Sequence, residues 1–203
     1  SCPSKNNCGK QATCTIENNP NNKIKNIIGI MSGKGGVGKS TVTSLIAKKL
    51  NKEGYKVGIL DADITGPSIP RLMGLKNERA ISSDGVNIFP VVSKEGIKTM
   101  SINYMVGDES QPVVFKGPLI SNTIKQFYKD VMWEELDYLL IDMPPGTGDV
   151  ALTVMQSLPI TGMVMVSVPQ DMISMIVAKG INMAKKLNVN VLGVVENMSY
   201  IQC

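Results

Sequence analysis

Hydrophobic residues are distributed in two different patterns along the chain after residue 24. Short and almost continuous apolar runs, typical of strands buried on both faces, occupy residues 25–31, 56–60, 138–141, 162–168 and 189–195. Between these runs, apolar residues recur every three or four positions, which predicts helices over residues 40–50, 120–131, 149–158 and 172–187. Strands that alternate with helices predict an α/β fold with a doubly wound, mostly parallel sheet and helices on both faces.

Two segments depart from this alternation. Residues 81–103 hold short extended pieces around Gly96, which predict a hairpin-like insertion. Residues 1–23 are polar, end in an asparagine-rich stretch and show neither a helical nor a strand period. We therefore expect an N-terminal tail over residues 1–23 and one folded domain over residues 24–203, a length at which a single core is the default.

Charge and hydrophobicity limit the partners and the chemistry. Lysines supply nearly all of the positive charge and are scattered, so the net charge of +4 does not demand a nucleic-acid partner. The longest apolar stretch, residues 160–168, is too short to cross a membrane, and the N-terminus lacks the apolar run of a signal peptide. We expect a cytoplasmic protein with no nucleic-acid or membrane partner. The chain contains no histidine, so catalysis must use carboxylates, lysines, backbone amides or thiols.

A glycine-rich loop between the first predicted strand and the first predicted helix matches the pattern G-x-x-x-x-G-K-[ST]. Glycines let the backbone N–H groups of such a loop turn toward phosphate oxygens, and the helix N-terminus adds its positive dipole end. We expect Lys39 to reach the β- and γ-phosphates of ATP, Ser40 to ligate Mg²⁺, and Thr41 to contact the α-phosphate. The predicted nucleotide-binding residues of the loop are Gly33, Lys34, Gly35, Gly36, Val37, Gly38, Lys39, Ser40 and Thr41.

The same loop also satisfies the dinucleotide-binding pattern G-x-G-x-x-G through Gly33, Gly35 and Gly38, and Asp61 follows about twenty residues later. A dinucleotide loop does not use a lysine and a hydroxyl directly after its third glycine. A nucleoside triphosphate with Mg²⁺ needs both groups. We therefore favour ATP over a dinucleotide.

Asp142 ends the apolar strand 138–141 and is the candidate Walker-B aspartate, which contacts Mg²⁺ through a bound water. Pro144, Pro145 and Gly146 follow it, so on its own Asp142 could equally begin a turn. The glycine loop earlier in the chain favours the metal-binding interpretation. We therefore expect Asp142 to lie close to Ser40.

Two further carboxylates, Asp61 and Asp63, end the strand at residues 56–60. Side chains two residues apart in an extended segment point to the same side, so both can lean toward the loop. We expect Asp61 to make a Mg²⁺-shell or structural contact, although it could simply cap a turn.

Lys34 narrows the class of P-loop protein, because ordinary P-loops do not require a lysine at this position. The alternative is that Lys34 is a solvated loop lysine. With Lys34 included, the loop resembles the deviant Walker A of the MinD-like ATPases, which include nitrogenase iron protein and partition ATPases. The resemblance implies a homodimer in which Lys34 reaches the partner's nucleotide, where its charge would act as an arginine finger does elsewhere. It also implies that Asp63 orients the attacking water, although Asp61 and Asp63 could exchange roles. The expected catalytic residues are then Lys34, Lys39 and Asp63.

Three more stretches resemble the Mrp/Nbp-type iron–sulfur cluster carrier ATPases: residues 61–70 (DADITGPSIP), 137–149 (DYLLIDMPPGTGD) and 196–199 (ENMS). This resemblance implies a protein that holds a [4Fe–4S] cluster between two subunits and delivers it to apo iron–sulfur proteins, gated by ATP binding and hydrolysis. It also implies that Asn197 hydrogen-bonds adenine through its amide, although a turn asparagine is the alternative.

The cysteines fit the same resemblance. In such carriers a C-x-x-C pair follows the ENMS stretch, and Cys203 matches its first cysteine. We therefore expect either that the second cysteine and the C-terminal end of the domain are missing from this chain, or that cluster binding at this site is impaired. Cys2 and Cys8 resemble the end of an N-terminal cluster motif of the Nbp branch, and Cys14 adds a further step of the same spacing. Clustered cysteines in a cytoplasmic chain favour metal over a disulfide, although a disordered tail with incidental thiols is the alternative.

The sequence thus predicts an ATP-binding and ATP-hydrolysing iron–sulfur cluster carrier. One alternative is a MinD-type or partition-type positioning ATPase, which would require an amphipathic helix or a basic stripe that the sequence does not show. Another is a nucleotide-responsive scaffold with negligible turnover, in which ATP changes only the affinity for a partner.

Overall fold

The structure is a computed structural model that describes residues 19–63, 66, 68–82, 87–105, 117–169 and 171–200, without the side chains of residues 117–119 and 171–176. Its main element is a seven-stranded sheet in the order β5-β6-β2-β7-β1-β8-β9. Every neighbouring pair is parallel except β5 and β6. The strands are β1 (Lys23–Ser32), β2 (Val57–Asp61), β5 (Val91–Val92), β6 (Lys98–Met100), β7 (Glu135–Asp142), β8 (Gly162–Ser167) and β9 (Asn190–Glu196). The predicted mostly parallel sheet is confirmed.

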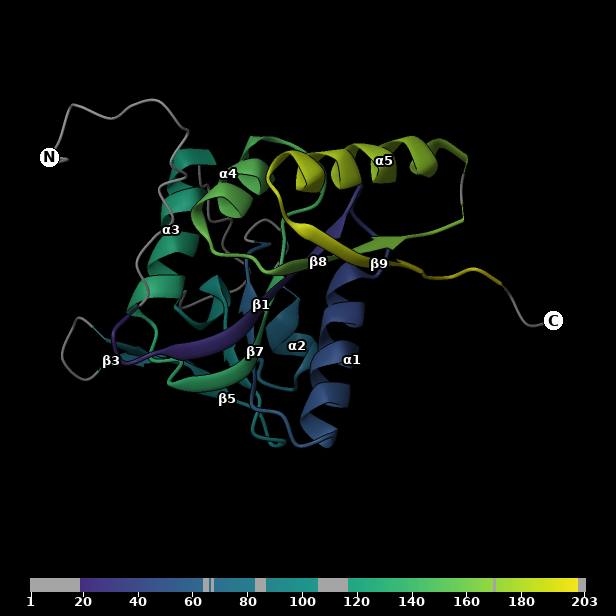
Figure 1. The fold of residues 1–203 in the computed structure, drawn as a ribbon. Coiled ribbons are helices and arrows are strands. Elements are labelled where there is room, and N and C mark those ends of the chain that lie inside the picture. The colour runs from purple at the N-terminus through teal and green to yellow at the C-terminus, as the bar shows by residue number, and fades with distance from the viewer. Residues whose placement is uncertain are drawn as a thin grey trace, which may run out of the picture.

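Helices cover both faces of the sheet (Figure 1). On one side lie α1 (Lys39–Lys52), which contacts β1, β2, β7 and β8, and the short α2 (Ile69–Leu72). On the other side lie α4 (Asp149–Ser157) and α5 (Asp171–Lys186), with α3 (Gly117–Asp130) packed against α4. Because the central strands are covered twice, all five residues of β2 and the last four of β7 are buried.

The segment that we predicted as a hairpin-like insertion forms two antiparallel pairs. β3 (Ile81–Ser82) pairs with β4 (Ile88–Phe89) as a separate small sheet, and β5 pairs with β6. β6 also pairs in parallel with β2, so the prediction of an insertion was wrong for this strand, which belongs to the main sheet. The reason is burial: Thr99 and Met100 are fully buried beside β2, but a three-residue strand is too short to produce a recognisable period. β6 is followed by a 3₁₀ turn, η1 (Ile102–Tyr104).

The register of the central strands places the candidate residues at one edge of the sheet. Asp142 of β7 lies opposite Asp61 of β2 and opposite Ile30 of β1. The carboxyl ends of these three strands are therefore level, and the glycine loop begins directly after β1 at the same edge. In open parallel sheets, ligands bind at this edge.

Candidate nucleotide-binding site

The glycine loop turns tightly between β1 and α1. Gly36 and Gly38 have φ angles of 78° and 82°, in the left-handed region that favours glycine. At Gly38 a second constraint applies, because an added Cβ would collide with the side-chain amide of Asn197. Gly38 is the N-cap residue of α1, so no side chain caps the N-terminus of this helix, and its first turn contains no acidic residue. The loop therefore presents backbone N–H groups and a positive helix end to an anion.

Lys39, the first residue of α1, points its ammonium group into a cluster of carboxylates. Its Nζ lies 2.8 Å from Oδ1 of Asp142 and 3.5 Å from Oδ2 of Asp63, and its side chain is only 5% exposed. A buried cation between carboxylates interacts with them much more strongly than an exposed one does. The structure thus brings together three residues that the sequence predicted, from α1, from the end of β7 and from the segment after β2.

Asp142 is fully buried and accepts three hydrogen bonds from α1. Lys39 and Thr43 donate to Oδ1, at 2.8 Å and 3.0 Å, and Ser40 donates to Oδ2 at 2.5 Å. Mg²⁺ prefers oxygen ligands, usually one or two from protein together with phosphate oxygens and water. The hydroxyl of Ser40 and the carboxylate of Asp142 converge as such a set, so the residues present fit the predicted Mg²⁺.

Asp61 is the second fully buried carboxylate of the site, 1% exposed. Its Oδ2 accepts a hydrogen bond from Ser101 at 3.1 Å, and its Oδ1 accepts one from the backbone N–H of Asp63 at 3.2 Å. Burial raises the pKa of Asp61 well above its usual value, and the negative charge of Asp142 raises it further, while the charge of Lys39 acts in the opposite direction. Asp61 therefore belongs to the electrostatic network around Lys39.

A pocket of about 450 Å³ opens above these groups. Its wall includes Lys39, Ser40 and Thr41 from the start of α1, and Asp63 from the segment after β2. The other lining residues come from the end of β1, from the glycine loop, from residues 66–72 and from the loop after β7; they are Ser32, Gly35, Gly36, Gly38, Gly66, Ser68, Leu72 and Pro145. The pocket can accommodate a phosphate chain against the loop.

Asn197 approaches the same loop from a distant part of the sequence. It follows β9, its backbone N–H donates to the carbonyl of Ser167, and its side-chain amide donates to the carbonyl of Val37 at 3.0 Å. The contact with adenine stays a prediction. Lys34 is half-buried, and its carbonyl accepts a hydrogen bond from Ser32 at 2.9 Å; its role across a dimer also stays a prediction.

Two polar residues of the site were missed by sequence reasoning. Thr43 follows Lys39 by one helical turn, so the helical period was the signal that could have identified it. Ser101 follows the short β6, and no local pattern relates it to Asp61. Only the sheet pairing places it there.

The predicted cluster ligands Cys2, Cys8, Cys14 and Cys203 lie outside the described residues. Within the described part of the chain, no group of three or more Cys, Asp or Glu side chains is arranged to hold a metal. Among the described helices, none combines the length and the apolar character needed to span a membrane.

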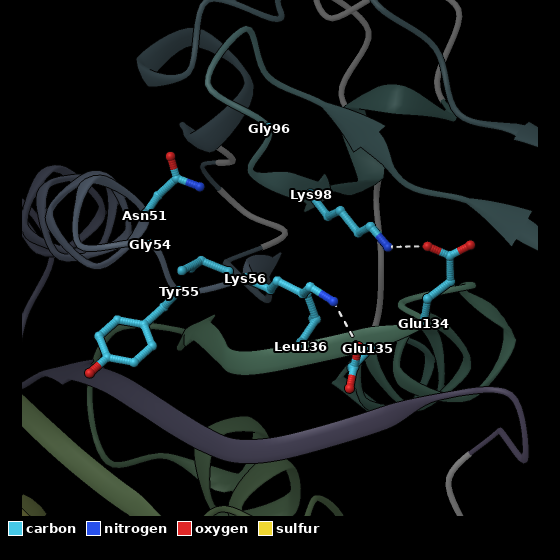
Figure 2. A pocket seen from close by; sticks show the side chains of 10 residues that line it. Asn51, Gly54, Tyr55, Lys56, Gly96, Lys98, Glu134, Glu135 and Leu136 are labelled. Carbon is cyan, nitrogen blue, oxygen red and sulfur yellow. Dashed lines mark hydrogen bonds and ion pairs between the residues drawn. The ribbon is translucent and has the colours of Figure 1, made fainter.

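A larger hollow, of about 570 Å³, lies at the opposite edge of the sheet and is lined by residues at the amino ends of β2, β6 and β7. Figure 2 shows that its lysines point toward neighbouring glutamates. Lys56 bonds Glu135 at 2.7 Å, and Lys98 bonds Glu134 at 2.6 Å. The lysines of this hollow are therefore paired with glutamates of the same hollow.

A strand, a glycine loop and a helix that bring Lys39 and Ser40 to a buried aspartate on a neighbouring strand define a P-loop NTPase. The comparison with protein families agrees. The family model described as ParA, NUBPL iron-transfer P-loop NTPase, matches residues 23–203, and the chain belongs to this family.

Several curated relatives are named "Iron-sulfur cluster carrier protein". The one from Clostridium perfringens is 54% identical over 97% of this chain and 71% of its own length. The one from Methanocaldococcus jannaschii is 51% identical over 100% of this chain and 71% of its own length. The one from Escherichia coli K12 is 49% identical, and the match covers 93% of this chain but about half (51%) of that relative.

Solved structures confirm the fold. A nucleotide-binding protein from Archaeoglobus fulgidus, solved in complex with ADP, is 50% identical and superposes with a TM-score of 0.78 over 89% of this chain and 69% of its own. The cell division protein MinD of Aquifex aeolicus is 22% identical, with a TM-score of 0.58 over 83% of this chain and 68% of its own. At this identity the second likeness shows the fold alone.

Proposed function

We propose that the protein binds and hydrolyses ATP and uses this cycle to carry an iron–sulfur cluster, a [4Fe–4S] cluster, to apo iron–sulfur proteins. The observation that supports the nucleotide part is the contact of Lys39, Ser40 and Asp142 beneath the glycine loop. The carrier part is supported by membership of the iron-transfer family and by relatives named as cluster carriers at 49% to 54% identity.

The residues of the site have distinct roles in hydrolysis. The loop amides and Lys39 bind the β- and γ-phosphates, and Asp63, which lines the pocket, accepts a hydrogen bond from the attacking water and orients it. The water oxygen forms a bond to the γ-phosphorus, and the bond between this phosphorus and the β–γ bridging oxygen breaks. Its electron pair leaves with ADP; one proton of the water stays on the inorganic phosphate, and the other is released to solvent.

Mg²⁺, when bound, neutralises negative charge on the β- and γ-phosphates. Ser40 would hold it directly and Asp142 through a water, while Asp61 supports the network from the neighbouring strand. These assignments are supported by the convergence of Ser40 and Asp142 at the end of β7 and by the pairing of Asp61 with Asp142 across the sheet.

The active unit in this proposal is a homodimer. Lys34 supplies positive charge to the partner subunit's nucleotide, and the cluster is cargo held between the subunits. Cys203 is its proposed ligand, with Cys2, Cys8 and Cys14 as a second proposed thiol set. A positioning ATPase of the MinD or partition type is not favoured by any observation on the described residues, because the likeness to MinD shows only the fold.

The test is anaerobic reconstitution of the purified chain with iron and sulfide, followed by absorption spectra and by iron and acid-labile sulfide per subunit. Three proteins are compared: the wild type, the Cys203→Ala variant, and a variant with Cys2, Cys8 and Cys14 all changed to alanine. ATP hydrolysis is measured on the same samples, and transfer is followed as the recovery of activity of an apo iron–sulfur enzyme.

We expect the wild type to hold iron and sulfide, to hydrolyse ATP and to activate the apo enzyme. Loss of the cluster in Cys203→Ala would place the cargo at the dimer interface, and loss only in the triple variant would place it at the N-terminus. A wild type that hydrolyses ATP but never holds iron or sulfide would contradict the carrier function and leave the NTPase intact.

A further inference from the structure

We propose that Thr43 is a positioning residue for Asp142, one that keeps this carboxylate oriented while nucleotide and Mg²⁺ engage its other partners. The inference rests on the proposed function, because it concerns the same site. It identifies a role for a residue that lies outside the glycine loop and that the loop motif does not include.

The geometry places Thr43 beneath the site. Lys39, Ser40 and Thr43 lie on one face of α1, since residues separated by three and four positions are neighbours on a helix. Thr43 is fully buried, and its Oγ1 lies 3.0 Å from Oδ1 of Asp142. It does not line the nucleotide pocket, so its hydroxyl serves the carboxylate and not the ligand directly.

The hydroxyl of Thr43 has two acceptors and one hydrogen. It lies 3.0 Å from the carbonyl of Lys39, a contact that threonine often makes within a helix, and 3.0 Å from the Asp142 carboxylate. A hydrogen bond to an ionised carboxylate is about twice as strong as one to a neutral group, so donation to Asp142 is favoured whenever Asp142 is charged.

The three donors of Asp142 have different fates in the proposed cycle. Lys39 turns its ammonium toward the phosphates, and Ser40 turns its hydroxyl toward Mg²⁺. Among the side chains that the structure describes around Asp142, Thr43 is then the donor that keeps its bond. Since Asp142 contacts Mg²⁺ through a water, any rotation of the carboxylate weakens Mg²⁺ binding.

The experiment compares Thr43→Val, which removes the hydroxyl at nearly constant shape, with Thr43→Ser, which keeps it. Ser44→Ala is the matched control, because Ser44 makes the same bond to a carbonyl one turn earlier, that of Ser40 at 2.9 Å, without touching Asp142. The readout is the equilibrium dissociation constant of ADP, measured calorimetrically in EDTA and over a series of Mg²⁺ concentrations. Thermal unfolding is recorded for each variant.

We expect Thr43→Val to require about tenfold more Mg²⁺ than the wild type for the same increase in ADP affinity. Substitution of residues that hydrogen-bond a metal ligand typically lowers metal affinity by this factor or more. Its ADP affinity in EDTA should equal that of the wild type. Thr43→Ser should restore the Mg²⁺ dependence, and Ser44→Ala should leave it unchanged.

Three outcomes would overturn the inference. Equal Mg²⁺ dependence in Thr43→Val and the wild type, or an equal shift in Ser44→Ala, would show that the hydroxyl supports only the helix. A loss of ADP affinity in EDTA would show a general defect of the pocket.

If Thr43→Val does not fold, Thr43→Ala replaces it in the same comparison. A wild type that binds no ADP would instead contradict the proposed nucleotide function itself.

Discussion

Two clusters of lysine and acidic residues lie at opposite edges of the same sheet, and they differ in burial rather than in geometry. At the carboxyl edge, Lys39 and Asp142 are 2.8 Å apart, with side chains 5% and 0% exposed. At the amino edge, Lys56 and Glu135 are 2.7 Å apart, with side chains 61% and 58% exposed. An ion pair in water contributes little to stability, whereas a buried one is strongly coupled and costly to break. Separation alone therefore does not distinguish a functional cluster from a surface one.

The two edges also respond to pH in opposite directions. The pKa of Asp61 is raised by burial, so the folded state holds a proton more tightly than the unfolded state and its contribution to stability declines as pH rises. At the amino edge, the lysine partners lower the pKa values of Glu134 and Glu135, so their contribution is present at neutral pH and is lost on acidification. Of the two edges compared, the nucleotide edge is therefore the one where one carboxylate raises the pKa of another, and a bound cation would reduce this repulsion.

The largest expected effect is that of Lys39→Met. The change removes the cation that reaches the phosphates and leaves Asp142 and Asp61 buried without it. We expect nucleotide binding to be lost and ATP hydrolysis to fall by at least about 100-fold, as for other groups that stabilise charge in a transition state. The free energy of unfolding should fall by about 3 to 5 kcal/mol, the usual cost of removing one partner of a buried pair.

Lys48→Met is the matched control for this change. Lys48 lies on the same helix, but it is exposed. Its substitution should leave both hydrolysis and the urea midpoint unchanged. If Lys39→Met proved as stable as Lys48→Met, the difference in burial between the two edges would not have the energetic meaning that we assign to it.

A smaller effect is expected from alanine in the glycine loop, and here two glycines can be compared. Gly36→Ala should cost about 1 to 2 kcal/mol, because its φ of 78° disfavours a Cβ while nothing lies within 4 Å of that atom. Gly38→Ala carries the same backbone cost at a φ of 82°, and its Cβ also collides with Asn197. Such overpacking adds about 1 to 3 kcal/mol.

The collision can be isolated with Asn197→Ala. In a double-mutant cycle measured by urea unfolding, Gly38→Ala combined with Asn197→Ala should recover the overpacking part but not the backbone part. Gly36→Ala combined with Asn197→Ala should instead be additive. Additivity in both combinations would contradict the contact between the glycine loop and the residue after β9.

The sequence was sufficient to predict the long strands and the four long helices, because each leaves a local pattern, but it did not predict the short α2. That Lys39, Ser40 and Asp142 lie close together could be expected from the spacing of the motif and from an apolar strand that ends in an acid. Ser101 and the pairing of β6 with β2 could not, because they depend on contacts between distant segments. The difference in burial between Lys39 and Lys56 is likewise a tertiary property. Lys39 begins α1 and Lys56 directly precedes β2, and the composition of the chain does not indicate which of the two is buried.

The smallest expected effect is that of Lys56→Met at the amino edge. Lys56 lowers the pKa of Glu135 below its usual value of 4.5, first through their hydrogen bond, so the pair stabilises the protein above pH 4.5 and ceases to do so as pH falls through the lower folded value. Because both side chains are largely exposed, the urea midpoint at pH 7 in about 150 mM salt should not change measurably. At low ionic strength a slight loss of stability should be visible at pH 7 and should vanish below the folded pKa of Glu135.

Lys98→Met should lower the stability more than Lys56→Met at every pH, since Lys98 is only 20% exposed and also donates to the carbonyl of Trp133 at 2.8 Å. A Lys56→Met variant as unstable as Lys39→Met would show that proximity, and not burial, determines the strength of these pairs.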